Sequence, residues 1–579
     1  MWHGNWRDEL WAQLDGDWDV VVVGGGITGA GILREAARRG LRVLLVEQRD
    51  FAWGTSSRSS KLVHGGLRYL AHGQVMLTWA SVREREHLLD DGPGLIDPLG
   101  FLVATHKGDK PGKWTYRAGL TVYDLMALQW SHRRYSAAAF RMLAPHITDA
   151  GLVGGFRYGD AQTDDARLTL RVIREAVADG GARHCAALNY VAATGLLRDD
   201  AGQVIGATLH DAVADRVADV RARVVINATG AWADRLRGQV GGEARIRPLR
   251  GSHLIFPDWR LPVAQAVAFL HPLDSRPVFV FPWEGVTLVG TTDVDHGAPL
   301  DEEPGISPEE VAYLMAAVAH QFPARALTLD DVIASYAGVR PVIGTGKADP
   351  SQESRESVVW QEDGLLTVTG GKLTTFRRVA LDALKAARDR LPELPKFSAV
   401  DPVLDTVEVE LPAITDEAVR RRLLGRYGAD APALVEAAQP GELEAIPGTR
   451  TLWAELRWAA RAEGVVHLED LLLRRARIGL LLAEGGVDHL ERVRQICQHE
   501  LGWDDDRWAA EAAAYRELWQ RHYGLPERAL IPDWQAMLAG AQSEEAEPKR
   551  RGRTSLVALA GGLALLVVWW RRRAGAKAA

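Results

Sequence analysis

The strongest hydrophobic pattern lies near the N-terminus, in residues 18–50, which read WDVVVVGGGITGAGILREAARRGLRVLLVEQRD. A run of β-branched residues predicts a buried strand, and a small-residue helix then leads to a second apolar strand. Gly24, Gly26 and Gly29 hold the GxGxxG positions, where a missing Cβ permits a sharp turn, close approach to a pyrophosphate and tight helix–strand packing. Glu47 ends the second strand, where a carboxylate can accept hydrogen bonds from ribose hydroxyls. Together these features predict a βαβ unit that binds a dinucleotide.

Two later segments repeat the strand-to-turn pattern. Residues 222–234 (ARVVINATGAWAD) place Gly230 in a small-residue turn after an apolar run. In residues 365–384 (LLTVTGGKLTTFRRVALDAL), a glycine pair separates a strand from a helix that we expect to begin near Thr374. The N-terminus of that helix would present free N–H groups to an electron-rich group such as a reduced isoalloxazine. Ordinary strand-to-helix turns are the alternative, but three cofactor-type turns favour FAD over NAD.

The remaining pattern divides the chain further. Segments 91–159 and 256–334 contain short strands and predict an antiparallel sheet that covers the flavin. Between these segments, DDARLTLRVIREAVADGGARHC predicts a helix that leads into a strand. From 405 to 535, Ala, Leu, Arg and Glu recur at helical spacing and predict a small helical bundle. The arginines of LLLRRARIG within it fit a solvated helix face or ion pairs with neighbouring acids better than a lipid-binding patch.

A different apolar run lies close to the C-terminus. Residues 554–570 (TSLVALAGGLALLVVWW) carry no charge and lie between PKRRGR and RRRAGAKAA. As a helix this segment would span roughly 25 Å, slightly less than a hydrocarbon core of about 30 Å, and the terminal tryptophans and flanking arginines suit an interface. We expect a transmembrane anchor after a linker at 536–553. A core helix or an amphipathic surface helix fits less well, because the run has no polar face.

Composition narrows the functional classes. The chain of 579 residues is 47% hydrophobic, and its net charge is −7, so we expect several domains and no nucleic-acid partner. Two distant cysteines, Cys185 and Cys497, predict neither a disulfide nor a metal site and favour a reducing compartment. Residues 1–18 carry acids and tryptophans where a signal peptide would need cations and an apolar run. We therefore expect a protein anchored in the inner or cytoplasmic membrane, with its catalytic body in the cytoplasm.

Several motifs occur in an order typical of one family: GGGITGAGILREAARRG, TSSRSSKLVHGGLRYL, DDARLTL, NATGAWAD, GSHLIFP, GTTDVD, YAGVRP and TGGKLTTFRRVA. The chain resembles FAD-dependent glycerol-3-phosphate dehydrogenases, closely over 17–390 and more loosely beyond 400. This resemblance implies oxidation of sn-glycerol 3-phosphate to dihydroxyacetone phosphate, with hydride transfer to FAD and electron transfer to a membrane quinone.

The resemblance also implies an α/β fold, in which a Rossmann-type FAD-binding domain is interleaved with an antiparallel-sheet substrate domain. A C-terminal α-helical cap domain would follow. The C-terminal membrane helix is predicted by the apolar run at 554–570 alone and departs from this family, whose bacterial members associate with the membrane peripherally. We expect the oxidoreductase to occupy 1–400, with FAD-binding segments 17–90, 160–255 and 335–390, substrate-domain segments 91–159 and 256–334, and the cap at 405–535.

Specific residues receive roles by the same resemblance. Arg340, Arg355 and Lys372 are implied to bind substrate, with Arg68 and Tyr69 near its glycerol end, and an arginine fork suits phosphate. A structural ion pair for Arg340 and an exposed loop for Arg355 are the alternatives. The residues implied to contact FAD are Gly24, Gly26, Gly29, Glu47, Thr55, Ser56, Ser57, Ser59, Ser60, Lys61, Leu62, His64, Gly230, Gly371, Lys372, Leu373 and Thr374.

The oxidation also needs an acceptor for the hydroxyl proton. His64 and His253 are the candidates, since neutral imidazole titrates near working pH; transfer assisted by Arg340 and transfer to water remain open. An oxidase that uses oxygen, a flavin dehydrogenase for an amino or 2-hydroxy acid, and a flavin-binding scaffold without turnover are the competing functions. The apolar tail favours quinone over oxygen. A homodimer is one option for assembly.

Overall fold

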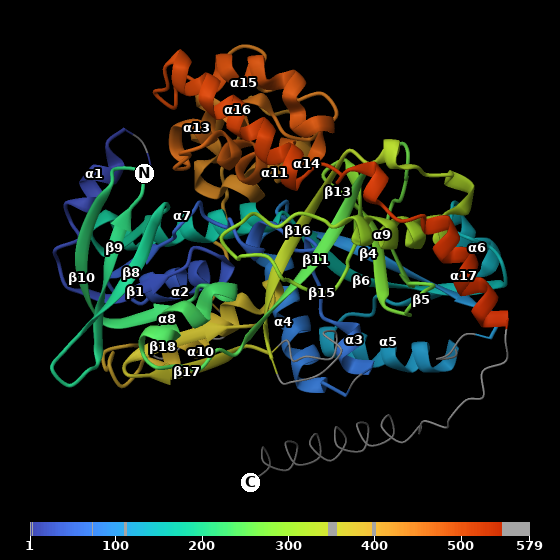
Figure 1. Ribbon diagram of the computed structural model, residues 1–579, viewed down its shortest axis with the longest axis horizontal. Coiled ribbons are helices and arrows are strands. Elements are labelled where there is room, and N and C mark those ends of the chain that lie inside the picture. The colour runs from blue at the N-terminus through green and yellow to red at the C-terminus, as the bar shows by residue number, and fades with distance from the viewer. Residues whose placement is uncertain are drawn as a thin grey trace, which may run out of the picture.

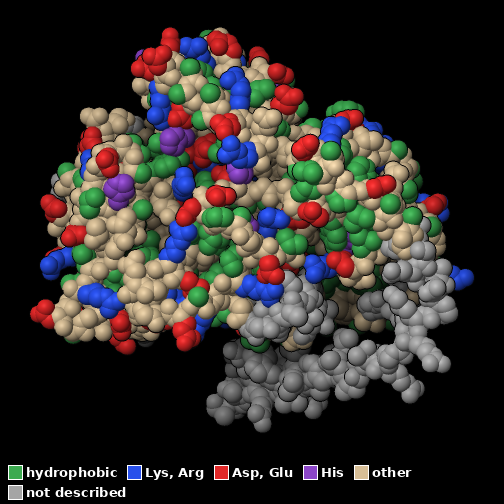
Figure 2. Space-filling view, viewed as in Figure 1, with side chains coloured by type: hydrophobic (Ala, Val, Ile, Leu, Met, Phe, Trp, Pro, Cys, Tyr) green, Lys and Arg blue, Asp and Glu red, His purple; other side chains and the backbone are tan. Residues whose placement is uncertain are grey.

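The computed structural model describes residues 2, 4–71, 73–108, 113–344, 356–395 and 401–546. Two sheets lie side by side, with a group of helices above their junction (Figure 1). Acidic and basic side chains are interspersed over the face shown in Figure 2. The local basic motifs are therefore not part of a broad cationic field on that face.

The first sheet contains the predicted βαβ unit, in the strand order β17–β18–β10–β1–β2–β7. The strands in this order run parallel except for β17 at one edge, and the hairpin β8–β9 pairs antiparallel with the first half of β10. Val20 and Val22 face helices α2, α7 and α10, while Val21 and Val23 face the hairpin β8–β9. Burial on both faces explains the unbroken apolar run of β1. The bounds are β1 Trp18–Val23, α2 Ile27–Ala37, β2 Val43–Val46, α7 Asp165–His184, β7 Cys185–Leu188, β8 Val191–Arg198, β9 Val204–Asp211, β10 Arg216–Asn227, β17 Val358–Glu362, β18 Leu365–Thr369 and α10 Phe376–Ala386.

The second sheet follows the order β15–β11–β14–β13–β12–β4–β6–β3, with β16 beside β11 and β5 beside β6. Every pairing is antiparallel except that of β12 with β4, where the antiparallel expectation was wrong. Helix α9 packs against one face, and α4, α5 and the C-terminal helices bury part of the other. The bounds are β3 Leu62–Val63, α4 Val75–Asp91, β4 Ile96–His106, α5 Lys113–Ala127, β5 Arg133–Ser136, β6 Leu152–Thr163, β11 Ile246–Pro257, β12 Ala266–Leu270, β13 Pro277–Trp283, β14 Val286–Gly290, β15 Val294–Asp295, α9 Pro308–Gln321 and β16 Ala334–Ile343.

The C-terminal region is helical, as its spacing predicted (Figure 1). Its elements are α11 Glu417–Tyr427, α12 Ala431–Ala437, α13 Trp453–Ala462, the π-helix η8 Asp470–Arg475, α14 Ile478–Leu481, α15 Leu490–Cys497 and α16 Asp505–His522. Of the two expectations for the arginines of LLLRRARIG, the solvated helix face is wrong, because Arg474, Arg475 and Arg477 are at most 2% exposed. Ion pairing with neighbouring acids is confirmed for Arg474, which pairs with Glu469 and Asp470. The three arginines also pair with Asp50 and Asp165, which are far away in the sequence.

The chain after residue 533 departs from the predicted linker. Helix α17, Trp534–Ala546, lies beside α9, so the linker expected from 536 is helical up to 546. The expected membrane anchor at 554–570 lies outside the described residues. Among the helices that are described, none combines the length and the apolar character needed to cross a membrane.

Short helices complete the described chain. They are α1 Trp6–Trp11, α3 Leu67–Ala71, α6 Ala137–Leu143 and α8 Ala233–Gln239, together with the 3₁₀ segments η1 Thr55–Ser57, η2 Gly230–Trp232, η3 Pro323–Arg325, η4 Leu329–Asp331, η6 Leu373–Thr375, η7 Gly428–Asp430, η9 Ala483–His489 and η10 Arg528–Leu530. Three of these segments lie within motifs predicted to bind the cofactor and border the site described next: η1 in TSSRSSKLVHGGLRYL, η2 in NATGAWAD and η6 in TGGKLTTFRRVA.

Candidate active site

A cavity of about 2100 Å³ extends between the two sheets. The ends of β1, β10 and β18 contribute residues from the first sheet, and β4, β6, β12, β13 and β16 contribute residues from the second. The carboxyl ends of the parallel strands β1, β10 and β18 thus meet at one wall, which is where open α/β sheets bind their ligands.

The glycine turn after β1 has the geometry that a pyrophosphate requires. Gly24 has φ +114°, and an added Cβ there would lie 2.6 Å from the Ala228 carbonyl oxygen. A Cβ on Gly29 would lie 1.9 Å from the Gly24 carbonyl oxygen. Gly24 and Gly26 line the cavity, whereas Gly29 does not. Gly29 therefore permits close helix–strand packing, and Gly24 and Gly26 leave the wall open to a ligand.

Glu47 lines the cavity just beyond the end of β2. Its Oε2 accepts a hydrogen bond from the Gly25 amide at 2.7 Å, and its Oε1 accepts one from the Arg49 amide at 2.9 Å. Each carboxylate oxygen has a further lone pair with which it can accept a ribose hydroxyl. The carboxylate is therefore oriented by the backbone before any ligand binds.

The serine-rich loop after β2 divides into two faces. Thr55, Ser56, Ser59, Ser60 and Leu62 line the cavity, whereas Ser57 and Lys61 do not. In particular, Ser56 Oγ accepts a hydrogen bond from the Ile27 amide at 2.9 Å and so joins the loop to the first turn of α2.

Lys61 was predicted to contact FAD, but its side chain points away from the cavity, so the prediction now rests on its backbone alone. Its ammonium group is fully buried and donates to Asp165 Oδ1 at 2.9 Å and to the Ser57 carbonyl oxygen at 2.7 Å. Burial, together with the charge of Arg477, lowers the pKa of Lys61 to about 7, although Asp165 opposes this shift. Lys61 holds the loop from behind the cavity wall.

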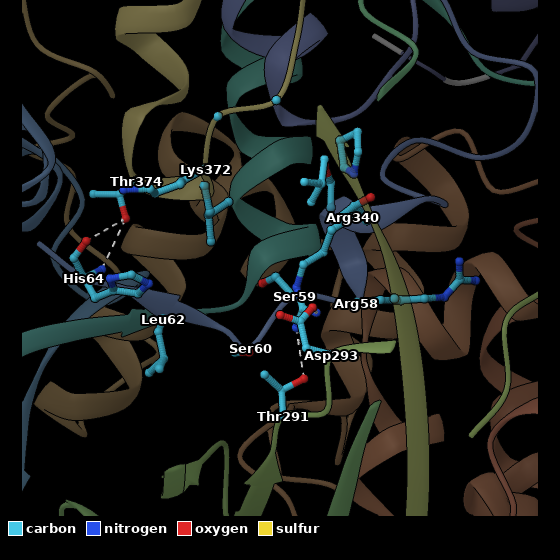
Figure 3. A pocket seen from close by; sticks show the side chains of 18 of the residues that line it. Arg58, Ser59, Ser60, Leu62, His64, Thr291, Asp293, Arg340, Lys372 and Thr374 are labelled. Carbon is cyan, nitrogen blue, oxygen red and sulfur yellow. Dashed lines mark hydrogen bonds and ion pairs between the residues drawn. The ribbon is translucent and has the colours of Figure 1, made fainter. Parts of the chain in front are cut away.

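The turn after β18 forms the opposite part of the cavity wall. Gly371, Lys372, Leu373 and Thr374 all line the cavity, as Gly230 does after β10. The helix predicted near Thr374 begins as η6 and continues as α10 from Phe376. Figure 3 shows Thr374 beside His64, and its Oγ1 accepts a hydrogen bond from the His64 amide at 3.2 Å. This contact joins two loops that lie far apart in the sequence.

Two of the predicted substrate cations lie at the cavity. Arg340 on β16 is half-buried and lines it, and its Nη1 is 3.0 Å from Asp293 Oδ1 while its Nη2 donates to Thr291 Oγ1 at 3.0 Å (Figure 3). Arg340 therefore both forms the ion pair considered as its alternative and faces the cavity. The Lys372 ammonium lies 3.5 Å from the centre of the Tyr69 ring. Both residues also line the cavity.

Two other predicted substrate residues fall wholly or partly outside the described residues. Arg355 lies outside the described residues. Arg68 belongs to α3, but its side chain is outside the described part of the chain. Their predicted contacts with substrate remain predictions.

The two candidate histidines differ in position. His64 lines the cavity and is half-buried. His253 on β11 is 1% exposed, does not line the cavity and stacks on Tyr336 at 4.5 Å between ring centres. Its Nε2 lies 2.9 Å from Ser60 Oγ, which does face the cavity. Burial, and secondly the charge of Arg340, lower the pKa of His253 well below its usual value. His253 therefore lies behind Ser60, and its predicted role as proton acceptor, which stays a prediction, would run through the serine hydroxyl.

Other cavity residues were not predicted. Thr291 and Asp293 belong to the quoted motif GTTDVD, but their contacts with Arg340 arise only when β14 and β16 both pair with β11. Four aromatic residues that were not predicted, Phe101, Tyr116, Tyr158 and Phe279, line the cavity together with the predicted Tyr69. The periodicity of a helix or strand predicts only that such residues are buried in the core. It does not indicate that they line a cavity.

Comparisons with known proteins agree with this geometry. A family model described as FAD-dependent oxidoreductase matches residues 19–377, and one described as the C-terminal domain of alpha-glycerophosphate oxidase matches residues 403–508. The aerobic glycerol-3-phosphate dehydrogenase of Staphylococcus aureus (strain USA300) is 35% identical over 539 residues, which cover 88% of this chain and 95% of the relative. That of Staphylococcus saprophyticus is 34% identical over 86% of this chain and 93% of the relative. The chain belongs to the aerobic, FAD-dependent glycerol-3-phosphate dehydrogenase family.

Solved structures place this dehydrogenase family member in a known fold. The glycerol-3-phosphate dehydrogenase of Bacillus halodurans, solved with FAD, has a TM-score of 0.71 and 27% identity over 90% of this chain and 98% of that one. The L-alpha-glycerophosphate oxidase of Mycoplasma pneumoniae shares the fold, with a TM-score of 0.50 and 19% identity over 64% of this chain and 94% of that one. The α/β oxidoreductase fold with a helical C-terminal region is thus confirmed, and FAD is the cofactor.

The cavity of this dehydrogenase fits FAD on its own geometry. Pyrophosphate would fit the space left at Gly24, which a Cβ would fill, and the hydroxyl-bearing wall at Ser56 and Ser59. The ribose would fit the oriented carboxylate of Glu47. We assign these residues to the adenosine and pyrophosphate portion. The turn at Gly371 and η6 then remains for the flavin ring.

Proposed function

We propose that this protein oxidises sn-glycerol 3-phosphate to dihydroxyacetone phosphate and passes the electrons to a membrane quinone. The observation that carries the proposal is the position of Arg340 and Lys372, two cations in the wall of a cavity that is also lined by the FAD-binding turns. A carboxylate substrate would need one such cation, whereas a phosphate dianion is best matched by two. The names of the relatives support the same substrate.

Arg340 is the proposed phosphate ligand. Asp293 and Thr291 hold its guanidinium plane, so little side-chain entropy would be lost when the guanidinium binds phosphate oxygens. Asp293 also offsets the charge of Arg340 while the site is empty of substrate. Lys372, which lies over the Tyr69 ring, supplies the second cation.

His64 is the proposed acceptor of the hydroxyl proton. It lines the cavity beside Thr374 in the turn after β18, so a substrate bound in the cavity could place its hydroxyl near the imidazole. Bound FAD would accept the hydride from the carbon that bears this hydroxyl. The Ser60–His253 pair offers a second route for the proton, in which the serine hydroxyl would lie between substrate and imidazole.

Quinone as acceptor is supported by large apolar side chains exposed on α4, on α5 and just after α5, two helices that contact each other. We call this set of residues the apolar face: Met76, Trp79, Trp114, Leu125, Leu128 and Trp130, all between 45% and 78% exposed. Exposed tryptophans suit a lipid interface, where tryptophan is favoured. Tyr116, two residues from Trp114, lines the aromatic part of the cavity. A lipid-soluble acceptor could thus reach the flavin from the membrane side.

Membrane attachment follows from the same surface and from the apolar run at 554–570. We propose that this run anchors the protein and that the apolar face lies in the interface, with the catalytic body on the cytoplasmic side.

The decisive experiment is anaerobic addition of sn-glycerol 3-phosphate to the FAD-loaded protein. Bleaching of the flavin absorbance is expected, and its recovery on addition of a short-chain quinone should be fast compared with recovery in oxygen. Bleaching by an amino acid or a 2-hydroxy acid instead would replace the proposed substrate. Rapid oxygen uptake with slow quinone reduction would make the protein an oxidase.

A further inference from the structure

The C-terminal helical region reaches the FAD-binding loop through buried arginines. We define residues 470–477, DLLLRRAR, as the arginine segment, and residues 50–61 as the cofactor loop. Arg474, Arg475 and Arg477 are 1–2% exposed. Their guanidinium groups contact the cofactor loop on the side opposite the cavity, and the cavity side of the loop carries the serines already described.

The first contact lies at the beginning of the cofactor loop. Asp50 Oδ2 accepts hydrogen bonds from Arg474 Nε and Arg475 Nη1, both at 2.6 Å, and Asp50 Oδ1 accepts one from Arg475 Nη2 at 2.7 Å. Burial alone would raise the pKa of this carboxyl, but Arg475 and Arg474 together lower it to about 2. Asp50 therefore stays ionised, and it lies three residues after Glu47, the carboxylate that faces the ribose.

The second contact lies in the middle of the cofactor loop. The Ser57 carbonyl oxygen accepts a hydrogen bond from Arg477 Nη2 at 2.8 Å as well as the one from Lys61. Arg477 also lies 3.1 Å from Asp165 Oδ1, while Asp165 Oδ2 accepts a hydrogen bond from the Ser59 amide at 2.9 Å. The backbone at Ser57 and Ser59 is thus held by groups that never touch the cavity.

Stability alone does not explain why these arginines and acids are buried together. Buried ion pairs seldom stabilise a protein more than apolar packing of the same volume, because both charges lose their hydration. They do, however, fix the positions of their partners through directional hydrogen bonds. Arg477 in addition adopts φ +63°, a left-handed conformation that is unfavourable for a residue with a side chain. Several hydrogen bonds together hold Arg477 in this conformation and so fix the position of its guanidinium.

We propose that the arginine segment is a positioning element for FAD, and that Arg477 is its main positioning residue. Arg474 and Arg475 hold the start of the cofactor loop, and Arg477 holds the backbone carbonyl between the cavity-lining Ser56 and Ser59. The C-terminal region then serves to keep these serines in the geometry that the cofactor needs. The proposal rests on the FAD assignment and is independent of the proposed substrate.

The test uses full-length protein freed of FAD and measures FAD affinity by fluorescence titration. Arg477→Gln should raise the Kd for FAD at least tenfold and should blur the vibrational shoulders of the bound flavin's absorbance band. Arg477→Lys, which keeps the charge, should have an intermediate Kd. The matched control is Arg422→Gln. Arg422 on α11 pairs with Glu455 inside the C-terminal region and with Glu284 between β13 and β14 of the second sheet, and it does not contact the cofactor loop.

The control separates positioning from general stability. Both Gln variants should lower the Tm of the FAD-free protein, but Arg422→Gln should keep the Kd for FAD within twofold of the parent value. If Arg477→Gln also stays within twofold, the positioning role is refuted. Equal increases in Kd for both variants would likewise overturn it, since the effect would then be general loosening.

A measurement on the unaltered protein covers the case in which Arg477→Gln does not fold. Hydrogen exchange of the FAD-free chain in rising urea should show that peptides from the cofactor loop and from the arginine segment lose protection together. Loss of protection in the loop at clearly lower urea, with the arginine segment still protected, would show that the segment does not hold it.

Discussion

Replacement of Arg340 by alanine tests the proposed phosphate site most directly. The Arg340 side chain is 21% exposed, so its hydrogen bonds to a phosphate dianion are largely shielded from water. Each charge-assisted hydrogen bond contributes about 1.5–3 kcal/mol, and loss of two at the lower figure costs about 3 kcal/mol of substrate binding. At 1.4 kcal/mol per factor of ten, kcat/KM should fall by about 150-fold. Most of the fall should appear as a higher KM.

The assay is dye reduction by sn-glycerol 3-phosphate, with glycerol as a substrate that lacks the phosphate. Arg340→Ala should reduce the preference for the phosphate ester over glycerol and leave the FAD content unchanged. Arg247→Ala is the matched control, because Arg247 pairs with Asp295 on the neighbouring strand and does not line the cavity. An unchanged preference in Arg340→Ala, or loss of FAD from that variant alone, would contradict the phosphate assignment.

Three further outcomes are expected. Burial lowers the pKa of His253, so below about pH 6.5 the unfolded chain binds a proton that the folded protein does not bind. The free energy of unfolding therefore decreases as the pH is lowered, by up to about 1.4 kcal/mol per pH unit. His253→Gln should therefore lose less Tm than the parent between pH 7 and pH 5, and an equal loss would disprove this. Gly29→Ala should purify without FAD, because its Cβ would meet the Gly24 carbonyl oxygen; normal FAD content would contradict the close packing. Removal of residues 547–579 should preserve dye reduction but strongly reduce flotation with liposomes, and unchanged flotation would exclude the tail as the anchor.

Much of the cofactor site could be predicted because its signals are local. Gly24, Gly26 and Gly29 are required by backbone geometry within one turn, and Glu47 follows its own strand. The pattern of strand, turn and helix also recurs around Gly371. In these segments each residue's role depends on neighbours a few positions away, so one sequence is enough to recognise it.

The outcome was different where a role depends on which distant segments meet. Lys61 occurs in a motif rich in hydroxyls and cations, yet its side chain turns away from the cavity to Asp165. His253 belongs to a family motif but lies behind Ser60. The arginines at 474, 475 and 477 have helical spacing typical of a solvated face, yet they are buried against acids that include Asp50 in the cofactor loop and Asp165 on α7.

The sequence by itself determined the dinucleotide-binding unit, the order of the elements, the choice of FAD and the family, because these depend on local periodicity and on motifs at given separations. Only the tertiary structure decided which face of the serine-rich stretch meets the cofactor, which histidine reaches the cavity and what the C-terminal arginines contact. The physical reason is that a buried charge must find a partner wherever the fold brings one. That partner lies more than a hundred residues away for Lys61 and more than four hundred for Arg475.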